Sequence, residues 1–150
     1  MMTTMTIEMM KNKTEMIPEE FQSLVEAAWK TRENAYAPYS HFKVGAAVET
    51  PDGEIYTGCN IENVSYGLTN CAERTAIFQA VAHGKTCFTR LAVCADTPEP
   101  VIPCGACLQV IREFGAQSKI LLVTKDGRWK QLTLQELLPY SFQDFPQEEE

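Results

Sequence analysis

Hydrophobic residues recur at helical spacing over residues 18–33, and polar residues fill the positions between them. The apolar stripe of this segment consists of Phe21, Leu24, Val25, Ala28 and Trp29. Pro18 suits the first turn of a helix, where a backbone N–H has no partner within the helix. The pattern therefore predicts a helix over 18–33 that buries one face.

Short apolar runs bounded by turn residues predict five strands farther along the chain. They cover residues 42–49, 54–59, 89–95, 119–124 and 128–133. Pro51-Asp52-Gly53 separates the first two runs, and Asp126-Gly127 separates the last two. Sequences of this kind favour tight turns, so each pair of runs is expected to form an antiparallel hairpin.

Three further segments have helical character: residues 71–83, 105–114 and 134–138. Asn70 is the expected N-cap of the first of these helices, and Gly84 its expected end. Gly115 is expected to end the second. Strands and helices alternate along the chain, which predicts a mixed five-stranded sheet covered by helices on both faces, a three-layer α/β/α arrangement.

A length of 150 residues fits one domain, and no repeat or linker divides it. All six methionines lie within residues 1–16, which show no clean period. We therefore expect a flexible N-terminal extension over residues 1–17, a folded domain over 18–142 and an acidic C-terminal tail over 143–150.

The charge balance and the absence of apolar stretches exclude several classes of protein. The formal net charge is −7, and Lys and Arg are scattered, so nucleic acid is not an expected partner. No run approaches the ~18 apolar residues of a membrane-spanning helix, so no membrane partner is expected. No secretory signal is visible either, which favours a reducing cytoplasm in which the six cysteines stay unpaired. Three of these cysteines are expected to be small buried hydrophobes: Cys59, Cys87 and Cys94.

The most informative motif is Cys71-Ala72-Glu73 followed by Pro103-Cys104-Gly105-Ala106-Cys107. Cys71, Cys104 and Cys107 can supply three thiolates to one Zn²⁺, which leaves the fourth tetrahedral position for water, as in catalytic zinc sites. Glu73 lies too close to Cys71 to bind the same ion comfortably, but it can move the protons of that water. This spacing is the signature of zinc deaminases.

Two alternatives compete with the catalytic interpretation. Asn70 and Glu73 also match a capping box, in which the carboxylate only caps its own helix. The Cys104-x-x-Cys107 pair could be half of a four-cysteine structural site, with Cys59, Cys94 or another residue closing the shell.

Two groups near the cysteines could support the chemistry. Arg74 is the nearest full positive charge, and we expect it to hydrogen-bond a ligand sulfur; a surface salt bridge is the alternative. Asn60 and Glu62 share one face if the chain there is extended, with Ile61 turned inward. An amide beside a carboxylate can bind the vicinal diol of a ribose, although a plain polar loop fits the spacing as well.

Several runs together resemble one family, the short, homotetrameric cytidine deaminases. They are Val44-Gly45-Ala46-Ala47, Gly58-Cys59-Asn60-Ile61-Glu62-Asn63, Asn70-Cys71-Ala72-Glu73-Arg74-Thr75-Ala76, Pro103-Cys104-Gly105-Ala106-Cys107 with Gln109-Val110, and Leu137-Leu138-Pro139 with Phe142. The similarity extends over about residues 20–142. It implies the cytidine deaminase-like fold and the hydrolysis of cytidine and 2′-deoxycytidine to uridine and 2′-deoxyuridine, with release of ammonia, in pyrimidine salvage.

The resemblance also assigns roles to individual residues. It implies one Zn²⁺ per subunit on Cys71, Cys104 and Cys107, with a zinc-bound hydroxide as nucleophile and Glu73 as the proton shuttle. Substrate contacts are implied for Asn60 and Glu62 on the ribose and for Phe42, Tyr66 and Ala72 in the pocket. An aromatic residue from a neighbouring subunit of a homotetramer closes the site in this family; Phe142 is the expected residue, with Phe145 as the alternative. Leu108 stands where many relatives carry Arg, so any contact of that Arg is absent here.

Overall fold

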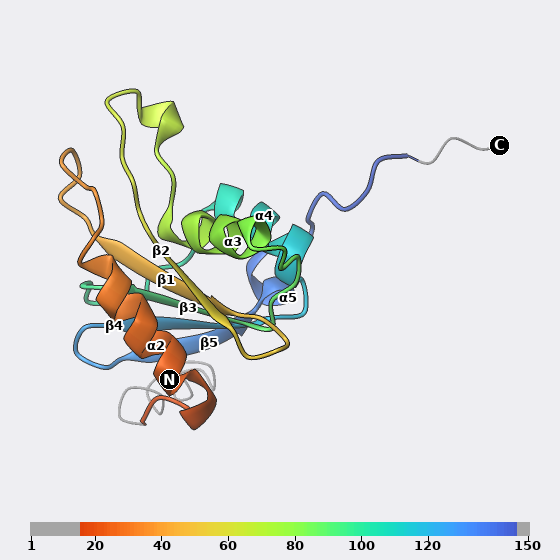
Figure 1. Ribbon diagram of the computed structural model, residues 1–150, viewed down its shortest axis with the longest axis horizontal. Coiled ribbons are helices and arrows are strands. Elements are labelled where there is room, and N and C mark those ends of the chain that lie inside the picture. The colour runs from red at the N-terminus through yellow and green to blue at the C-terminus, as the bar shows by residue number, and fades with distance from the viewer. Residues whose placement is uncertain (1–15, 147–150) are drawn as a thin grey trace, which may run out of the picture.

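The computed structural model describes residues 16–146, which form four helices, one short 3₁₀ helix and five strands (Figure 1). In chain order they are α2 (Glu19–Arg32), β1 (Val44–Glu49), β2 (Ile55–Cys59), η1 (Tyr66–Leu68), α3 (Ala72–Ala82), β3 (Arg90–Ala95), α4 (Gly105–Gly115), β4 (Lys119–Thr124), β5 (Trp129–Thr133) and α5 (Leu134–Leu137). Most of the expected N-terminal extension and residues 147–150 of the expected tail lie outside the described residues.

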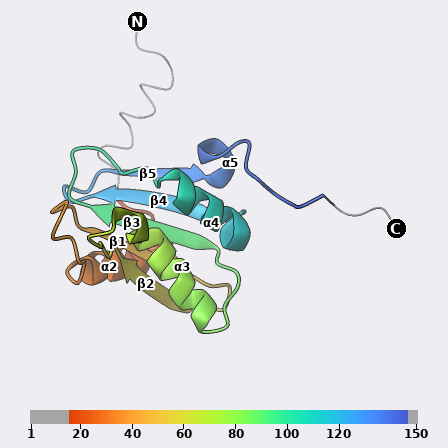
Figure 2. The same cartoon turned by 90° about the horizontal axis from the view of Figure 1, so that it is seen from above.

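The five strands form one mixed sheet in the order β2-β1-β3-β4-β5. The β3–β4 pair is parallel, and the other three pairs are antiparallel. Both predicted hairpins, β1–β2 and β4–β5, are confirmed. Figure 2 shows α3 and α4 over one face of the sheet and α2 behind the other, which confirms the three-layer arrangement.

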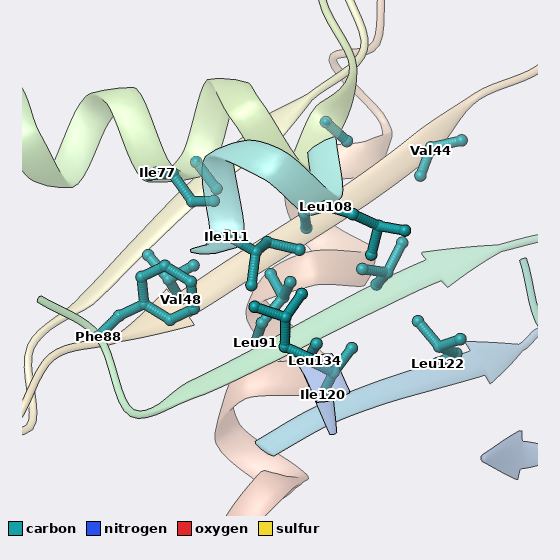
Figure 3. Packing of buried hydrophobic residues seen from close by; sticks show 14 of the residues in the cluster. Val44, Val48, Ile77, Phe88, Leu91, Leu108, Ile111, Ile120, Leu122 and Leu134 are labelled. Carbon is teal, nitrogen blue, oxygen red and sulfur yellow. The ribbon is translucent and has the colours of Figure 1, made fainter. Parts of the chain in front are cut away.

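Two hydrophobic clusters fill the spaces between the layers, because successive strand residues point to opposite faces. On the α3/α4 side, alternate positions of β1, β3 and β4 meet the helices (Figure 3); labelled members are Val44, Val48, Ile77, Leu91, Leu108, Ile111, Ile120 and Leu122. On the α2 side, the intervening positions meet that helix: Ala47, Ala92, Leu121 and Val123 pack with Phe21, Leu24, Val25 and Ala28. The sheet is therefore buried on both faces.

Helix α3 packs unusually close to β2, and Gly58 makes this possible. A Cβ at Gly58 would lie 2.3 Å from the Ala76 backbone nitrogen and 2.7 Å from the Ala72 carbonyl oxygen. Only a residue without a side chain allows the backbones to approach so far. The N-terminal half of α3 is thus fixed against the end of β2.

Both glycines that were predicted to end helices lie at helix ends. Gly115 is the last residue of α4, as expected, and it is also buried. A Cβ there would lie 2.3 Å from Cζ of Phe88, so this glycine makes room for an aromatic ring. Gly84, by contrast, follows α3 with a φ of +83°, which agrees with its predicted role.

None of the helices in residues 16–146 combines the length and the apolar character that crossing a bilayer requires.

Candidate active site

The three cysteines of the motif lie at the N-terminal ends of two adjacent helices. Cys71 is the N-cap of α3 and Cys104 is the N-cap of α4, both with extended backbone angles, and Cys107 lies in the first turn of α4. The prediction that Asn70 caps α3 is wrong: its side-chain amide instead donates to Thr75 Oγ1 at 3.1 Å. Helix N-termini carry free N–H groups and partial positive charge, which favour thiolates.

The sulfur atoms are spaced for a single tetrahedral metal ion. Cys71 Sγ lies 3.8 Å from Cys104 Sγ, and Cys104 Sγ lies 3.5 Å from Cys107 Sγ. All three lie within 4.8 Å of one another. A Zn–S bond of about 2.3 Å implies a sulfur–sulfur separation of about 3.8 Å in a tetrahedral site. The soft thiolate set and these distances fit zinc.

A fourth protein ligand is absent among residues 16–146, because only these three side chains form the group. Cys94 is buried on the α2 side of the sheet, where its thiol approaches the Val25 carbonyl, and Cys59 does not join the group. The four-cysteine alternative therefore fails. Cys104 is exposed whereas Cys107 is buried, so the metal site opens to one side. Cys87 is exposed too, contrary to the expectation that it is buried.

Glu73 is almost fully buried beside the thiols, with 4% of its surface exposed. No side-chain cap is present at the start of α3, so the capping-box alternative is wrong; the described capping box lies at Thr133 and Glu136 in α5. Burial raises the pKa of the Glu73 carboxyl, and the negative charge of Cys71 acts in the same direction. A carboxyl of this kind can hold a proton at a higher pH than an exposed one.

Arg74 turns toward the thiols. Its Nη2 donates to Cys71 Sγ at 3.4 Å, and the described residues offer it no carboxylate partner, which argues against the salt-bridge alternative. A hydrogen bond from the Cys107 thiol and the contact with Arg74 lower the pKa of Cys71 to about 5. The Nε of Arg74 is buried and lacks a hydrogen-bond partner in residues 16–146. Three thiolates with one Zn²⁺ leave a net negative charge, which this guanidinium compensates.

Backbone pairing brings a second group of residues toward Cys71. Ile61 forms isolated bridges with Tyr36 and with Asn70, and both Ile61–Asn70 hydrogen bonds measure 2.9 Å. The residue before the zinc ligand is thus tied to the Asn60–Glu62 segment. In Figure 1 the loops that follow α2 and β2 both extend beyond the end of the sheet. Ile61 itself is 47% exposed, so the expectation that it turns inward is wrong.

Asn60 and Glu62 hold the backbone of the loop that precedes β1. Asn60 Oδ1 accepts from the Val44 N–H at 2.9 Å, and its Nδ2 donates to the Phe42 carbonyl at 2.7 Å. Glu62 Oε1 accepts the N–H groups of Tyr39 and Ser40 at 3.0 and 3.1 Å, and Oε2 accepts the Ser40 hydroxyl. The Ser40 hydroxyl is the main reason that the pKa of Glu62 is lowered. Both side chains thus bind defined backbone groups of another loop, whereas the side chains of a plain polar loop would mainly face solvent.

The remaining candidate substrate contacts differ in exposure. Ala72 is fully buried, Phe42 is 39% exposed and Tyr66 is 74% exposed, with the Tyr66 ring in edge contact with Tyr39 at 5.9 Å. Phe142 and Phe145 follow α5 and pack against each other at 5.6 Å between ring centroids, and the Phe142 carbonyl accepts a hydrogen bond from Gln109 of α4 at 2.8 Å.

The sequence interpretation missed Tyr39 and Ser40. Pro38 before a Tyr-Ser pair marks a turn, but nothing local reveals that this turn binds a carboxylate from residue 62. Leu108, where the resemblance led us to look for Arg, has its side chain in the core between α4 and the sheet.

A groove of about 460 Å³ lies elsewhere, between the end of α4 and the residues after α5. Its lining includes Arg112, Ser118 and Leu138, and none of the thiols or Glu73. The thiol cluster and Glu73 therefore lie outside this groove.

Comparison with known proteins agrees with the geometry. Residues 18–123 match the family model described as the cytidine and deoxycytidylate deaminase zinc-binding region. A cytidine deaminase of Halalkalibacterium halodurans is 51% identical over 122 residues, covering 81% of this chain and 92% of the relative. A blasticidin-S deaminase of Bacillus cereus is 32% identical over 139 residues, covering 87% and 97%.

Solved structures give the same result for the fold. The crystal structure of cytidine deaminase from Burkholderia pseudomallei superposes with a TM-score of 0.79 at 47% identity, covering 84% of this chain and all of that one. The three-thiol cluster, which can hold a metal ion, and the buried Glu73 both lie within the matched residues. The chain therefore belongs to the cytidine and deoxycytidylate deaminase family of zinc enzymes.

Proposed function

We propose that this protein hydrolyses cytidine and 2′-deoxycytidine to uridine and 2′-deoxyuridine, with release of ammonia. The observation that carries the proposal is the buried carboxyl of Glu73 beside three sulfurs that can hold a single metal ion with one open position. Family membership supports it, since relatives at about half identity are named cytidine deaminases.

Cys71, Cys104 and Cys107 would hold the zinc, which when bound lowers the pKa of a water molecule toward ~7 and so supplies the nucleophile. Glu73 accepts a proton from the attacking water and delivers it to N3 of the cytosine ring as the C4–O bond forms. Glu73 then takes the remaining proton from the new C4 hydroxyl and passes it to the amino group, so that the C4–N bond breaks, ammonia leaves and the C4 carbonyl forms. A carboxyl whose pKa is raised toward the working pH can perform both transfers.

Arg74 acts on the cysteines and not on the substrate. Its hydrogen bond to Cys71 disperses the charge of that thiolate, and its own charge offsets the anionic site. With zinc bound, this hydrogen bond would reduce the electron density that Cys71 donates and so would keep the ion an effective Lewis acid.

Asn60 and Glu62 recognise the sugar in this proposal. One amide hydrogen of Asn60 and one oxygen of Glu62 have capacity left beyond the contacts described above. Phe42, Tyr66 and Ala72 would form further walls of the pocket. Ala72 is fully buried and follows Cys71 directly in the chain.

We further propose a homotetramer in which neighbouring subunits complete each site, with Phe142 or Phe145 as the aromatic residue that reaches across. Large apolar side chains are exposed in the loop over 60–70 and after α5, notably Val64, Tyr66, Leu68 and Phe142. Exposed apolar side chains that lie together are typical of interaction surfaces. The Phe142 carbonyl accepts a hydrogen bond from Gln109 Nε2 of α4 at 2.8 Å, which leaves the Phe142 ring 61% exposed beside that helix.

The acidic balance of the chain supports a small nucleoside as substrate in place of a polynucleotide, and its role would be pyrimidine salvage in the cytoplasm. A single-stranded oligonucleotide assay tests this part: deamination of cytosine within DNA or RNA would contradict it.

The decisive test is incubation of the purified protein with cytidine, with and without a strong chelator, while uridine is followed by chromatography. We expect uridine formation that the chelator abolishes and added Zn²⁺ restores. Bound zinc without turnover of any nucleoside would instead favour a noncatalytic zinc module.

Deamination of an aminonucleoside antibiotic is the second candidate, because a blasticidin-S deaminase is among the relatives. Rates on cytidine, free cytosine and blasticidin S separate the two. We expect cytidine to be the best of the three, since Asn60 and Glu62 are suited to an intact ribose.

A further inference from the structure

The turn over residues 37–42 adopts a conformation that needs outside support. His41 has a φ of +58°, and it is the one non-glycine residue in the described part of the chain with a positive φ. The left-handed region is disfavoured for residues with a Cβ and persists where surrounding contacts fix it. Within the turn itself, His41 N–H donates to the Ala37 carbonyl at 3.0 Å.

The main outside support is the carboxylate of Glu62. It accepts hydrogen bonds from the N–H groups of Tyr39 and Ser40 and from the Ser40 hydroxyl. An ionised carboxylate offers about four acceptor positions. Three are used by the turn, so about one remains, on the oxygen that faces the Ser40 hydroxyl.

Ser40 is the residue that links this carboxylate to the neighbouring ring. Its hydroxyl donates to Glu62 Oε2, and its oxygen accepts the Phe42 N–H at 3.1 Å. Asn60 holds the Phe42 carbonyl from the other side. Phe42, Glu62 and Asn60 are thus joined into a single hydrogen-bonded unit with Ser40 at its centre.

We propose that Ser40 is a positioning residue for sugar recognition: its hydroxyl fixes the one free acceptor site of Glu62 in the geometry that receives the sugar of a nucleoside. This role deepens the proposed function and rests on it. Ser40 donates its own hydroxyl to Glu62, so it acts through that side chain and need not touch the substrate.

The test compares Ser40→Ala and Ser40→Thr on two substrates, cytidine and 2′,3′-dideoxycytidine, which lacks the sugar diol. Ser65→Ala is the matched control, since Ser65 lies in the adjacent loop and its side chain makes no cap hydrogen bond. For Ser40→Ala we expect KM for cytidine to rise roughly 5- to 20-fold, as for loss of a hydrogen bond to a charged group. We expect kcat and zinc content to stay close to those of the unsubstituted chain, and kcat/KM for the dideoxy analogue to change less than twofold.

Ser40→Thr retains the hydroxyl, so its KM for cytidine should lie close to that of the unsubstituted chain. Two results would overturn the positioning role: an equal loss of kcat/KM on both substrates in Ser40→Ala, or a KM for cytidine in Ser40→Thr that is as high as in Ser40→Ala. A general loosening of the loop predicts both. Failure of the unsubstituted chain to deaminate either nucleoside is a different result: it would overturn the proposed function and this role with it.

Discussion

The two sides of the candidate site are held by different means. The buried wall, consisting of Ala72, Glu73 and Cys107, lies at helix starts that pack on the sheet, and each of these residues is at most 4% exposed. The loop edge, consisting of segments 36–42 and 60–70, is largely exposed and is held by backbone bridges and by the Asn60 and Glu62 side chains.

The difference has a functional consequence. A buried wall keeps thiols and carboxyl at fixed separations and excludes water, as bond-making chemistry requires. An exposed edge held by a few polar contacts can be finished by another subunit or by the substrate. Changes at the wall should therefore abolish chemistry or the fold, and changes at the edge should alter binding by degrees.

The largest effect is expected from Cys104→Ala, which removes a metal ligand. Cys104 is exposed, so the fold should survive while bound zinc and uridine formation are both lost. Metal analysis together with the cytidine assay measures this. Cys87→Ala is the control, because that thiol is also exposed but lies outside the cluster. Full turnover without zinc would show that the thiol cluster is not the centre of the chemistry.

Glu73→Gln should separate chemistry from metal binding. The amide fills the same buried space but cannot carry the protons, so kcat should fall about 10²–10⁴-fold while zinc content stays unchanged. Steady-state kinetics and metal analysis give both numbers. Glu113→Gln on the outer surface of α4 should leave kcat unchanged. Retained turnover in the Glu73 variant would remove the proton shuttle from the mechanism.

Gly58→Ala tests how tightly the wall is packed. The added methyl would meet the backbone of α3 at 2.3 Å, and we expect the free energy of unfolding to fall by about 1–3 kcal/mol. Gly67→Ala at the loop edge is the matched change, because nothing lies within 4 Å of its would-be Cβ. Urea unfolding of both variants measures the contrast. Equal stability of the two would show that the wall can relax as freely as the edge.

The sequence revealed the wall better than the edge, for physical reasons. The periodicity of apolar positions and the turn residues can be recognised within each short segment. The five strands, both hairpins and the helices that carry Cys71 and Cys104 were therefore predictable. The cysteine motif was also predictable, because metal binding restricts residue type and spacing. The helix cap at Cys71, the buried Gly115 and the exposed Ile61 depend on long-range contacts that no local pattern contains. The same holds for Ser40, whose partner lies 22 residues away.

Glu62→Gln is expected to have the smallest effect on stability among these changes and to act on it through charge. Hydrogen bonds from Ser40 and Tyr39 lower the pKa of Glu62, so the folded chain favours the ionised form. The resulting stabilisation is present above the unfolded pKa of about 4.3 and is lost as the pH falls through the lower folded value. The melting temperature of the variant should thus lie slightly below that of the unsubstituted chain at pH 7, and the gap should close in acid. Glu26→Gln on the exposed side of α2 is the control and should show no pH-dependent gap. A gap for Glu62→Gln that persists unchanged below pH ~3 would mean that the loop edge is held by shape and not by the carboxylate charge.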